Sequence, residues 1–220
     1  MMRFARLVTC FVIVTLTGVS RSQAQSASQP RWYGEVTAAA TLGHKSDTGF
    51  GGEAGGRFSD LLDVFIEGGH MGNVGNTDLD ARARKIADFL GGAVGTSAYK
   101  MNFFDVGVKY RVMETGRWHP YVGAGIGFAS VKPEVRFAVN GTDVTDQLPS
   151  LGVQLGADLS ESHNTFLFVI GLGTTVNFGS RYLADLTYRY GRTGGASDGD
   201  EVLIEGLNTQ RVQIGVGIRF

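Results

Sequence analysis

The sequence predicts an all-β fold: an eight-stranded antiparallel transmembrane β-barrel with both termini periplasmic, short periplasmic turns and long extracellular loops. Apolar and polar residues alternate through the chain, short and long connections follow one another, and no apolar run after the N-terminus suits a membrane helix. The 220 residues include 33 glycines and are 43% apolar, which excludes a disordered chain. A formal charge of −1 argues against a nucleic-acid partner.

The N-terminus has the three parts of a secretory signal peptide. Arg3 and Arg6 precede an apolar run over residues 7–19, and Ser22 and Ala24 are the small residues that a signal peptidase reads. We expect residues 1–24 to be removed and residues 25–220 to form one barrel domain. The single cysteine, Cys10, lies in the signal, so a disulfide scaffold or a cysteine-built zinc site is excluded.

The first four expected strands span residues 33–43, 50–58, 62–71 and 103–111. The first is the weakest, with small residues on its apolar face, and the second is rich in glycine. In the third and fourth, apolar residues regularly alternate with polar or glycine residues, as in a strand with one greasy and one polar face. All four have the length that a tilted strand needs to cross a membrane.

The last four expected strands span residues 121–129, 166–178, 182–191 and 209–220. The final segment is the clearest, because period-2 alternation continues to the last residue. Its apolar face carries Val212, Ile214, Val216, Ile218 and Phe220. Eight strands is an even number, as in single-chain outer-membrane barrels.

The connections between these strands indicate an orientation. Residues 44–49, 59–61, 112–120 and 179–181 are short connections, and residues 72–102, 130–165 and 192–208 are long ones. Outer-membrane barrels have short periplasmic turns and longer extracellular loops. Except for the short first connection, the order therefore places the long loops outside and both termini in the periplasm.

Aromatic residues gather at both expected membrane interfaces, as lipid-embedded barrels require. The periplasmic girdle comprises Trp32, Tyr33, Phe58, Tyr110, Trp118, Tyr121, Phe178, Tyr182 and Phe220. The outer girdle comprises Phe50, Phe103, Phe104, Phe128, Phe166 and Tyr190. A soluble, lipocalin-like barrel is the alternative, but it would carry its charges outside and its apolar residues inside.

The polar faces bring six acids and six bases into the lumen, where we expect them to pair because an unpaired buried charge is costly. The expected upper set is Glu53, Glu67, Asp105, Arg189 and Arg211. The expected lower set is Glu35, Asp63, Asp185, Arg57, Lys109, Arg111 and Arg219. The network is either a salt-bridged plug or the lining of a narrow, gated ion path; filled interiors at this strand number favour the plug.

Two loop segments have patterns of their own. Thr77 and Asp80 resemble a capping box, and Gly91-Gly92 can end a helix over residues 79–90. This helix either packs over the barrel mouth or lies at the interface, where Arg82, Arg84 and Lys85 contact lipopolysaccharide phosphates. Residues 135–145, with Asn140-Gly141 at the centre, predict a β-hairpin above the membrane.

The sequence resembles the OmpA-like family of eight-stranded outer-membrane barrels, which includes OmpX-type and opacity-type proteins. The matching segments are PYVGAGIGF at residues 120–128, DLTYRYGR at residues 185–192 and the terminal alternating segment. We expect the chain to lie in the cell outer membrane as a monomer, in contact with outer-membrane lipid and lipopolysaccharide. The resemblance implies that Val212, Ile214, Val216, Ile218 and Phe220 form a signal read by the barrel assembly machinery.

The resemblance says little about activity, and we expect no catalytic residues, no metal site and no cofactor. The leading hypothesis is a non-enzymatic barrel that supports envelope integrity or surface interaction through its extracellular loops. A narrow porin-like channel is the alternative. A lipid A-modifying enzyme ranks third, because His44-Lys45-Ser46 has the His-x-Ser spacing of outer-membrane deacylases but lies in a loop, with no carboxylate placed beside it by sequence.

Overall fold

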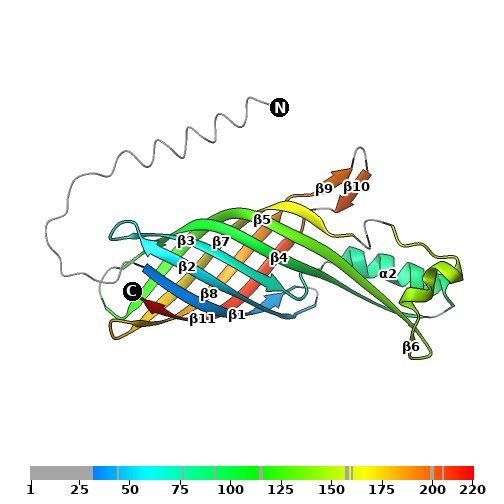
Figure 1. Ribbon diagram of the computed structural model, residues 1–220, viewed down its shortest axis with the longest axis horizontal. Helices are drawn as coiled ribbons and strands as arrows, with labels where there is room; N and C mark the ends of the chain where they lie inside the picture. Colours follow the sequence, from blue (N-terminus) through cyan, green and yellow to red (C-terminus); the bar gives the residue numbers. More distant parts are fainter. Residues whose placement is uncertain are drawn as a thin grey trace, which may run out of the picture.

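The computed structural model describes residues 32–43, 45–75, 77–91, 93–113, 116–156, 159, 161–198, 201–204 and 206–220. These residues form an elongated barrel that continues at one end into a folded extension (Figure 1). The expected signal peptide, residues 1–24, lies outside the described residues. In the described part of the chain, no helix has both the length and the apolar character needed to cross a membrane.

Eight of the described strands close into a barrel, which confirms the predicted fold class. They are β1 (Trp32–Leu42), β2 (Thr48–Arg57), β3 (Leu62–Met71), β4 (Val94–Arg111), β5 (Trp118–Val139), β7 (His163–Phe178), β8 (Tyr182–Thr193) and β11 (Asn208–Arg219). Their order around the wall is β4-β3-β2-β1-β11-β8-β7-β5, and pairing of β4 with β5 completes the ring. All neighbouring strands run antiparallel.

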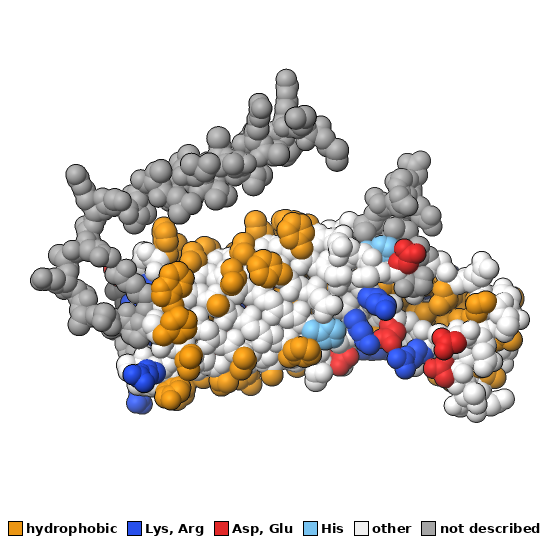
Figure 2. All heavy atoms as spheres, in the orientation of Figure 1, with side chains coloured by type: hydrophobic (Ala, Val, Ile, Leu, Met, Phe, Trp, Pro, Cys, Tyr) orange, Lys and Arg blue, Asp and Glu red, His pale blue; other side chains and the backbone are white. Residues whose placement is uncertain are grey.

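The barrel wall separates even-numbered from odd-numbered positions. Val36 and Ile66 are 66% and 49% exposed, whereas Glu67 and Asp105 are 1% and 0% exposed. Successive side chains of a strand point to opposite faces, so this difference places the apolar side chains outside and the charges inside. Figure 2 shows the apolar side chains spread as a belt over the barrel wall. A belt of this kind suits a lipid solvent and not water.

The two ends of the barrel differ in their connections. At the end that we call the turn end, residues 58–61, 112–117 and 179–181 join strands, and Gly116 and Gly179 adopt positive φ. The backbone N–H of Trp32 donates to the carbonyl of Phe220 at 3.1 Å there. The other end, the loop end, carries residues 43–47, 72–93, 140–162 and 194–207.

Two strands are longer than the sequence predicted, and the expected loops 72–102 and 130–165 are correspondingly shorter. β4 begins at Val94 and β5 continues to Val139, and residue pairs from Val94↔Ala138 to Lys100↔Lys132 extend beyond the last rungs shared with β3 and β7. We call residues 94–100 and 132–139 the ribbon. The prediction failed because the buried apolar residues of the ribbon, Tyr99, Val135 and Phe137, stand at odd positions, opposite in phase to the apolar residues of the barrel.

The ribbon carries the rest of the extension, and together they form what we call the head. The predicted loop helix is confirmed as α2 (Thr77–Phe89), with Gly91 at φ +76 after it. The predicted hairpin turns at Asn140 and Gly141, both at positive φ, as a tight two-residue turn requires. Its return strand is only β6 (Thr142–Asp143), and the 3₁₀ helix η1 (Thr145–Leu151) follows.

A separate two-stranded hairpin stands beside the head at the loop end. It consists of β9 (Ala196–Asp198) and β10 (Glu201–Ile204), which pair with each other. The sequence predicted a loop at residues 192–208, and this hairpin lies within it.

Candidate functional site

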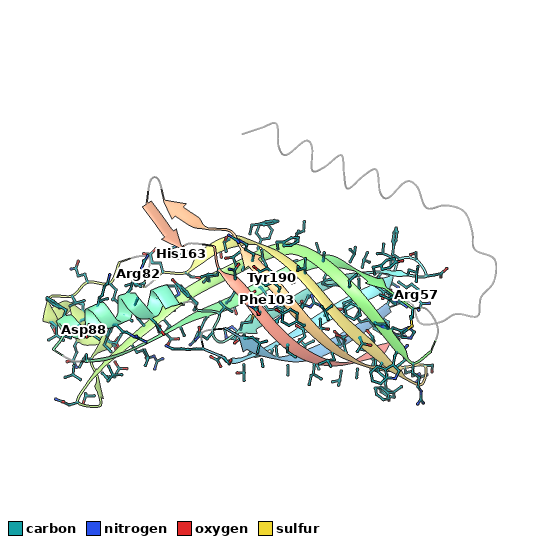
Figure 3. The ribbon with its side chains drawn as sticks, turned by 180° about the vertical axis from the view of Figure 1, so that it is seen from behind. Arg57, Arg82, Asp88, Phe103, His163 and Tyr190 are labelled. Atoms are coloured by element: carbon teal, nitrogen blue, oxygen red, sulfur yellow. The ribbon has the colours of Figure 1, made fainter. Side chains whose placement is uncertain are left out.

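The charges expected in the lumen all lie at odd, inward-facing positions. Glu35, Glu53, Asp63, Glu67, Asp105, Lys109, Arg111, Asp185, Arg189 and Arg211 are buried. Arg57 and Arg219 are half-buried. Figure 3 shows Arg57 near the turn end. The strand period of two places the charges there, since lipid contacts the opposite face.

Arg189 is the centre of the upper part of this network. Its Nη2 lies 2.5 Å from Oε2 of Glu53, and its Nη1 lies 2.7 Å from Oε2 of Glu67 and 4.0 Å from Oδ1 of Asp105. Nη2 of Arg211 lies 2.8 Å from the same Glu67 oxygen. All five residues of the expected upper set are therefore brought together.

Lys109 joins the two expected sets and does not stay in the lower one. Its ammonium group pairs with Glu53, which also accepts a hydrogen bond from Tyr33 at 2.5 Å. The ammonium nitrogen also lies 4.8 Å from the ring centroid of Tyr121 and 5.4 Å from that of Phe65. The long, flexible lysine stem gives it this reach, which the strand position alone does not reveal.

The lower part of the network is paired in a different way. Arg111 binds Asp63 with two nitrogens, Nε at 2.7 Å and Nη2. Asp185 instead accepts hydrogen bonds from hydroxyl groups, at 2.8 Å from both Tyr121 and Thr175. One carboxylate oxygen of Glu35 is buried without a hydrogen bond among the described residues. This part thus combines ion pairs with hydroxyl groups.

Side chains fill most of the lumen around these charges. One cavity, lined by Phe65, Lys109, Tyr121 and Arg189, measures about 10 Å³. A second, nearer the turn end and lined by Asp63, Arg111 and Asp185 among others, measures about 20 Å³. A cavity of about 10–15 Å³ holds a single water molecule. Neither cavity offers a continuous water-filled path.

An apolar cluster lies above the charges at the loop end, and the sequence analysis did not foresee it. Its fully buried members include Met71, Met101, Val131, Phe137 and Leu148. The guanidinium of Arg211 lies 4.3 Å from the ring centroid of Phe103, where the charged and apolar layers meet. Apolar residues at odd positions of the ribbon were the available signal.

The helix α2 packs into this cluster through Leu79, Ala83 and Ala87, which are 1–3% exposed. The candidate lipopolysaccharide-contacting residues Arg82, Arg84 and Lys85 lie on its exposed side. Figure 3 shows Arg82 at the end of the molecule opposite Arg57. The described structure thus packs the helix on the ribbon and leaves these three basic side chains facing solvent.

The first loop is tied to the head by a polar contact. The Nζ atom of Lys45 lies 2.7 Å from Oδ1 of Asp80 on α2, and the hydroxyl of Ser97 donates to the same oxygen. A carboxylate, which the sequence alone did not place, therefore lies beside this loop. His44, which the deacylase hypothesis needs, lies outside the described residues.

The aromatic girdles are corrected at three positions. Trp32, Phe58, Trp118 and the other even-numbered girdle residues point outward, as expected, with exposed fractions of about one half or more for most. Tyr33, Tyr121 and Phe103 have odd numbers and point inward. There they contact lumen charges, because alternation within a strand overrides nearness to an interface.

The terminal strand presents its apolar residues to the outside. Val212, Ile214, Val216, Ile218 and Phe220 are 36–69% exposed. A groove of about 690 Å³ lies on the outer wall beside this strand, where Gly34, Gly52 and Gly68 leave the surface low. The described residues include no group of three or more His, Cys, Asp or Glu side chains placed to hold a metal ion.

Comparison with known proteins identifies a family. The family model described as "Outer membrane protein beta-barrel domain" matches residues 11–220. No protein of curated function matches the sequence. The chain is similar to the solved structure of Neisserial surface protein A (NspA), with a TM-score of 0.51 and 15% identity, over 89% of this chain and 100% of that one.

Two other solved structures show the range of the similarity. The outer membrane protein OprG from Pseudomonas aeruginosa has a TM-score of 0.51 and 10% identity, over 90% of this chain and 99% of that one. The outer membrane enzyme PagL has a TM-score of 0.44 and 12% identity, over 82% of this chain and 97% of that one. At these identities the likeness shows the fold alone.

Proposed function

Because the chain belongs to the outer membrane protein β-barrel domain family, we propose that it is a closed outer-membrane barrel that holds a folded head at the cell surface. The turn end faces the periplasm and the loop end faces outward, as short periplasmic turns and long outer loops suggest. Residues 1–24 are removed on export. The apolar face from Val212 to Phe220 is read by the barrel assembly machinery.

The filled interior is the observation that carries this proposal. Arg189 and Lys109 reach across the lumen to Glu53, and the apolar cluster lies between these charges and the loop-end surface. A conducting pore needs a connected aqueous path, whereas the lumen cavities of about 10 and 20 Å³ have room for roughly single waters. The barrel therefore acts as an anchor and not as a channel.

Planar-bilayer recording separates this proposal from the porin-like alternative. We expect the full mature chain, verified as folded by its boiled and unboiled gel mobilities, to show no steady conductance steps. Steady steps that disappear when Arg211 and Glu53 are substituted would overturn the proposal and establish an ion path. Arg192, which points outward from β8, provides a control substitution.

The head favours a role in surface interaction and envelope integrity. Phe89, Val94 and Leu151 are 74%, 67% and 47% exposed, although they belong to the head and not to the lipid-facing belt. Apolar side chains exposed to water can mark contacts with other macromolecules. We expect Phe89→Asp to reduce adhesion of intact cells while surface expression of the barrel stays unchanged. Equal adhesion of the variant and native strains would contradict this role of Phe89.

Lipid A analysis tests the enzyme hypothesis, which the His44-Lys45-Ser46 spacing motivates. We expect no change in lipid A when His44→Ala replaces the native chain, because we propose an anchor without chemistry. The measurement is mass spectrometry of extracted lipid A from matched strains. Loss of a modified lipid A species in the variant would make the protein an enzyme.

A further inference from the structure

The ribbon has an inner and an outer face with different surroundings. Residues directly opposite in an antiparallel pair share a face, so Lys100↔Lys132, Ala98↔Glu134 and Thr96↔Arg136 place their side chains together. The inner face, with Tyr99, Val135 and Phe137, is buried in the apolar cluster. The part of the outer face nearest the barrel, around Lys100, Lys132, Glu134 and Arg136, is therefore polar and lies above the apolar belt.

This outer face carries more positive than negative charge. The carboxylate of Glu134 forms one ion pair with Lys100, at 2.5 Å, and another with Arg136, at 2.7 Å. Lys132 has no ion pair among the residues that the structure describes. Lys100 and Lys132 are directly opposite each other, and like charges in that arrangement destabilise a sheet. An anion bound at Lys132 would supply the counter-charge that Glu134 supplies to Lys100.

The two lysines lie close to the head-group region of a bilayer. Phe104, Phe128 and Phe166 form the last apolar row, and they are 50–66% exposed. Asn102 and Ser130 form the next row, and Lys100 and Lys132 the row after that. Four residues span about 13 Å along a strand, or about 9 Å along the membrane normal at a tilt of about 45°.

The polar region of a bilayer extends about 5–8 Å beyond the hydrocarbon on each side, so the backbone of the two lysines lies just above the lipid phosphates. Lysine stems also bend so that the ammonium group reaches the polar layer. Figure 2 shows Lys and Arg side chains, with acidic ones among them, gathered just beyond the apolar belt. Figure 3 shows Arg82 of α2 in the head, with Asp88 of the same helix farther out.

We infer that the outer face of the ribbon, centred on Lys100 and Lys132, binds the phosphorylated head groups of the surrounding lipid leaflet. Charge complementarity and the height of the two lysines select this occupant. The inference rests on the proposed insertion of the barrel into a membrane. It assigns the lipid contact to the ribbon, and not to Arg82 and Arg84 of the helix.

Lipid selectivity measures this contact directly. The full mature chain is inserted into phosphatidylcholine vesicles that contain 10% phosphatidylglycerol, and spin-labelled lipids report the preference of the protein for either head group. In the K100Q/K132Q variant, the relative affinity for phosphatidylglycerol over phosphatidylcholine should fall, by about fivefold for each lysine removed. The K100R/K132R variant should keep the preference, and 0.5 M salt should abolish it in the native chain.

The matched control is R82Q/R84Q, which removes the same charge from α2. We expect this control to keep the native lipid preference. Equal losses in both double variants would overturn the inference, because net charge would then explain the effect. Binding of inorganic phosphate that is lost in K100Q/K132Q, without a lipid preference in the native chain, would also overturn it in favour of a free-anion site.

Gel mobility separates failure of this inference from failure of the proposed function. A heat-dependent mobility shift in the same vesicles shows that the barrel has inserted. With that shift present and no lipid preference, the inference alone fails. Without the shift in the native chain, membrane insertion fails, and the lipid contact falls with it. Lys100 and Lys132 are exposed, so their substitution leaves the fold intact.

Discussion

The barrel and the head have opposite interiors, although the same two strands build both. On the inner face of β4, Asp105 is fully buried and its neighbours are charged side chains. Phe103, two residues away on the same face, is buried in the apolar cluster. On β5, Gly127 gives way to Ala129 and Val131 in the same manner. The inner face thus changes from polar to apolar within one step of the strand period.

The outer face explains this change. Along the barrel the outer face carries Phe104 and Phe128, which suit lipid, so the interior can hold paired charges. Along the ribbon the outer face carries Lys100 and Glu134, which suit water, so stability requires an apolar interior. The inversion between Phe104 and Asn102 therefore marks the edge of the proposed bilayer.

The strongest test of the comparison removes the centre of the charged interior. Arg189→Met leaves Glu53 and Glu67 without their shared partner, and breaking a buried pair costs about 3–5 kcal/mol. We expect the free energy of unfolding in urea to fall by that amount in lipid vesicles. Arg192→Met, at an outward position of the same strand, should change it by less than about 0.5 kcal/mol.

An equal stability of Arg189→Met and the native chain would show that the interior charges contribute nothing net. The barrel would then depend on its wall hydrogen bonds and its lipid-facing surface alone.

The second test removes the largest fully buried side chain of the head. Phe137 is 0% exposed, and Phe137→Ala costs about 3 kcal/mol in a core that can partly collapse. We expect this loss to open the head alone. Proteases should cut residues 72–93 and 140–162 about 100-fold faster, while the heat-dependent mobility of the barrel persists.

Phe128→Ala, on the outer face of the same strand, is the control, and we expect it to leave protease resistance of the head unchanged. If Phe137→Ala instead lowers barrel stability as much as Arg189→Met does, the two interiors form one cooperative unit.

The same inversion explains which parts of the fold the sequence predicted. Lipid contact imposes alternation on every barrel strand, so eight strands and the inward-facing charges could be predicted from residues such as Glu67 and Arg211. The sequence predicted loops at residues 94–102 and 131–134 and a separate hairpin strand at residues 135–139. The apolar residues that pack inward there stand at odd positions, opposite in phase to the barrel. An alternating segment whose phase reverses is still a strand, and reading Tyr99, Met101 and Phe103 together reveals it.

The pairings within the lumen were harder to predict than the residues. Alternation places Lys109 inside, but its stem length and the space beside Phe65 decide that it binds Glu53. Asp185 satisfies its oxygens with Tyr121 and Thr175, which no charge pattern predicts. Partner choice depends on the shear of the closed barrel, and the sequence alone does not specify that shear.

A third test concerns the layer just below the inversion. A Cβ atom added to Gly127 would lie 1.9 Å from the carbonyl oxygen of Phe104, so the backbone must move. We expect Gly127→Ala to lower the free energy of unfolding by about 1–3 kcal/mol, as for other overpacked sites. Gly34→Ala is the control, because nothing lies within 4 Å of its Cβ position. Equal stabilities of the two variants would show that this layer is loosely packed.

The smallest expected effect is a pH response confined to the ribbon. Hydrogen bonds from Lys100 and Arg136 lower the pKa of Glu134 below its ordinary value of about 4.5. A lowered pKa means that the folded ribbon favours the carboxylate, so this contribution is complete above about pH 4.5. It is lost as the pH falls through the lower pKa of the folded state. The ion pairs are partly exposed, so the contribution is small.

Hydrogen exchange of residues 94–100 and 132–139 measures this response. After correction for intrinsic rates, we expect exchange in the native chain to rise about two- to fivefold between pH 6 and pH 3. Glu134→Gln should remove the dependence. Asp143→Asn is the control, because hydrogen bonds from Thr145 lower the pKa of Asp143 at the hairpin and not in the ribbon. If hydrogen exchange of the ribbon still rises at low pH in Glu134→Gln, the response belongs to the charged barrel interior. The barrel and the head would then respond to pH as one unit.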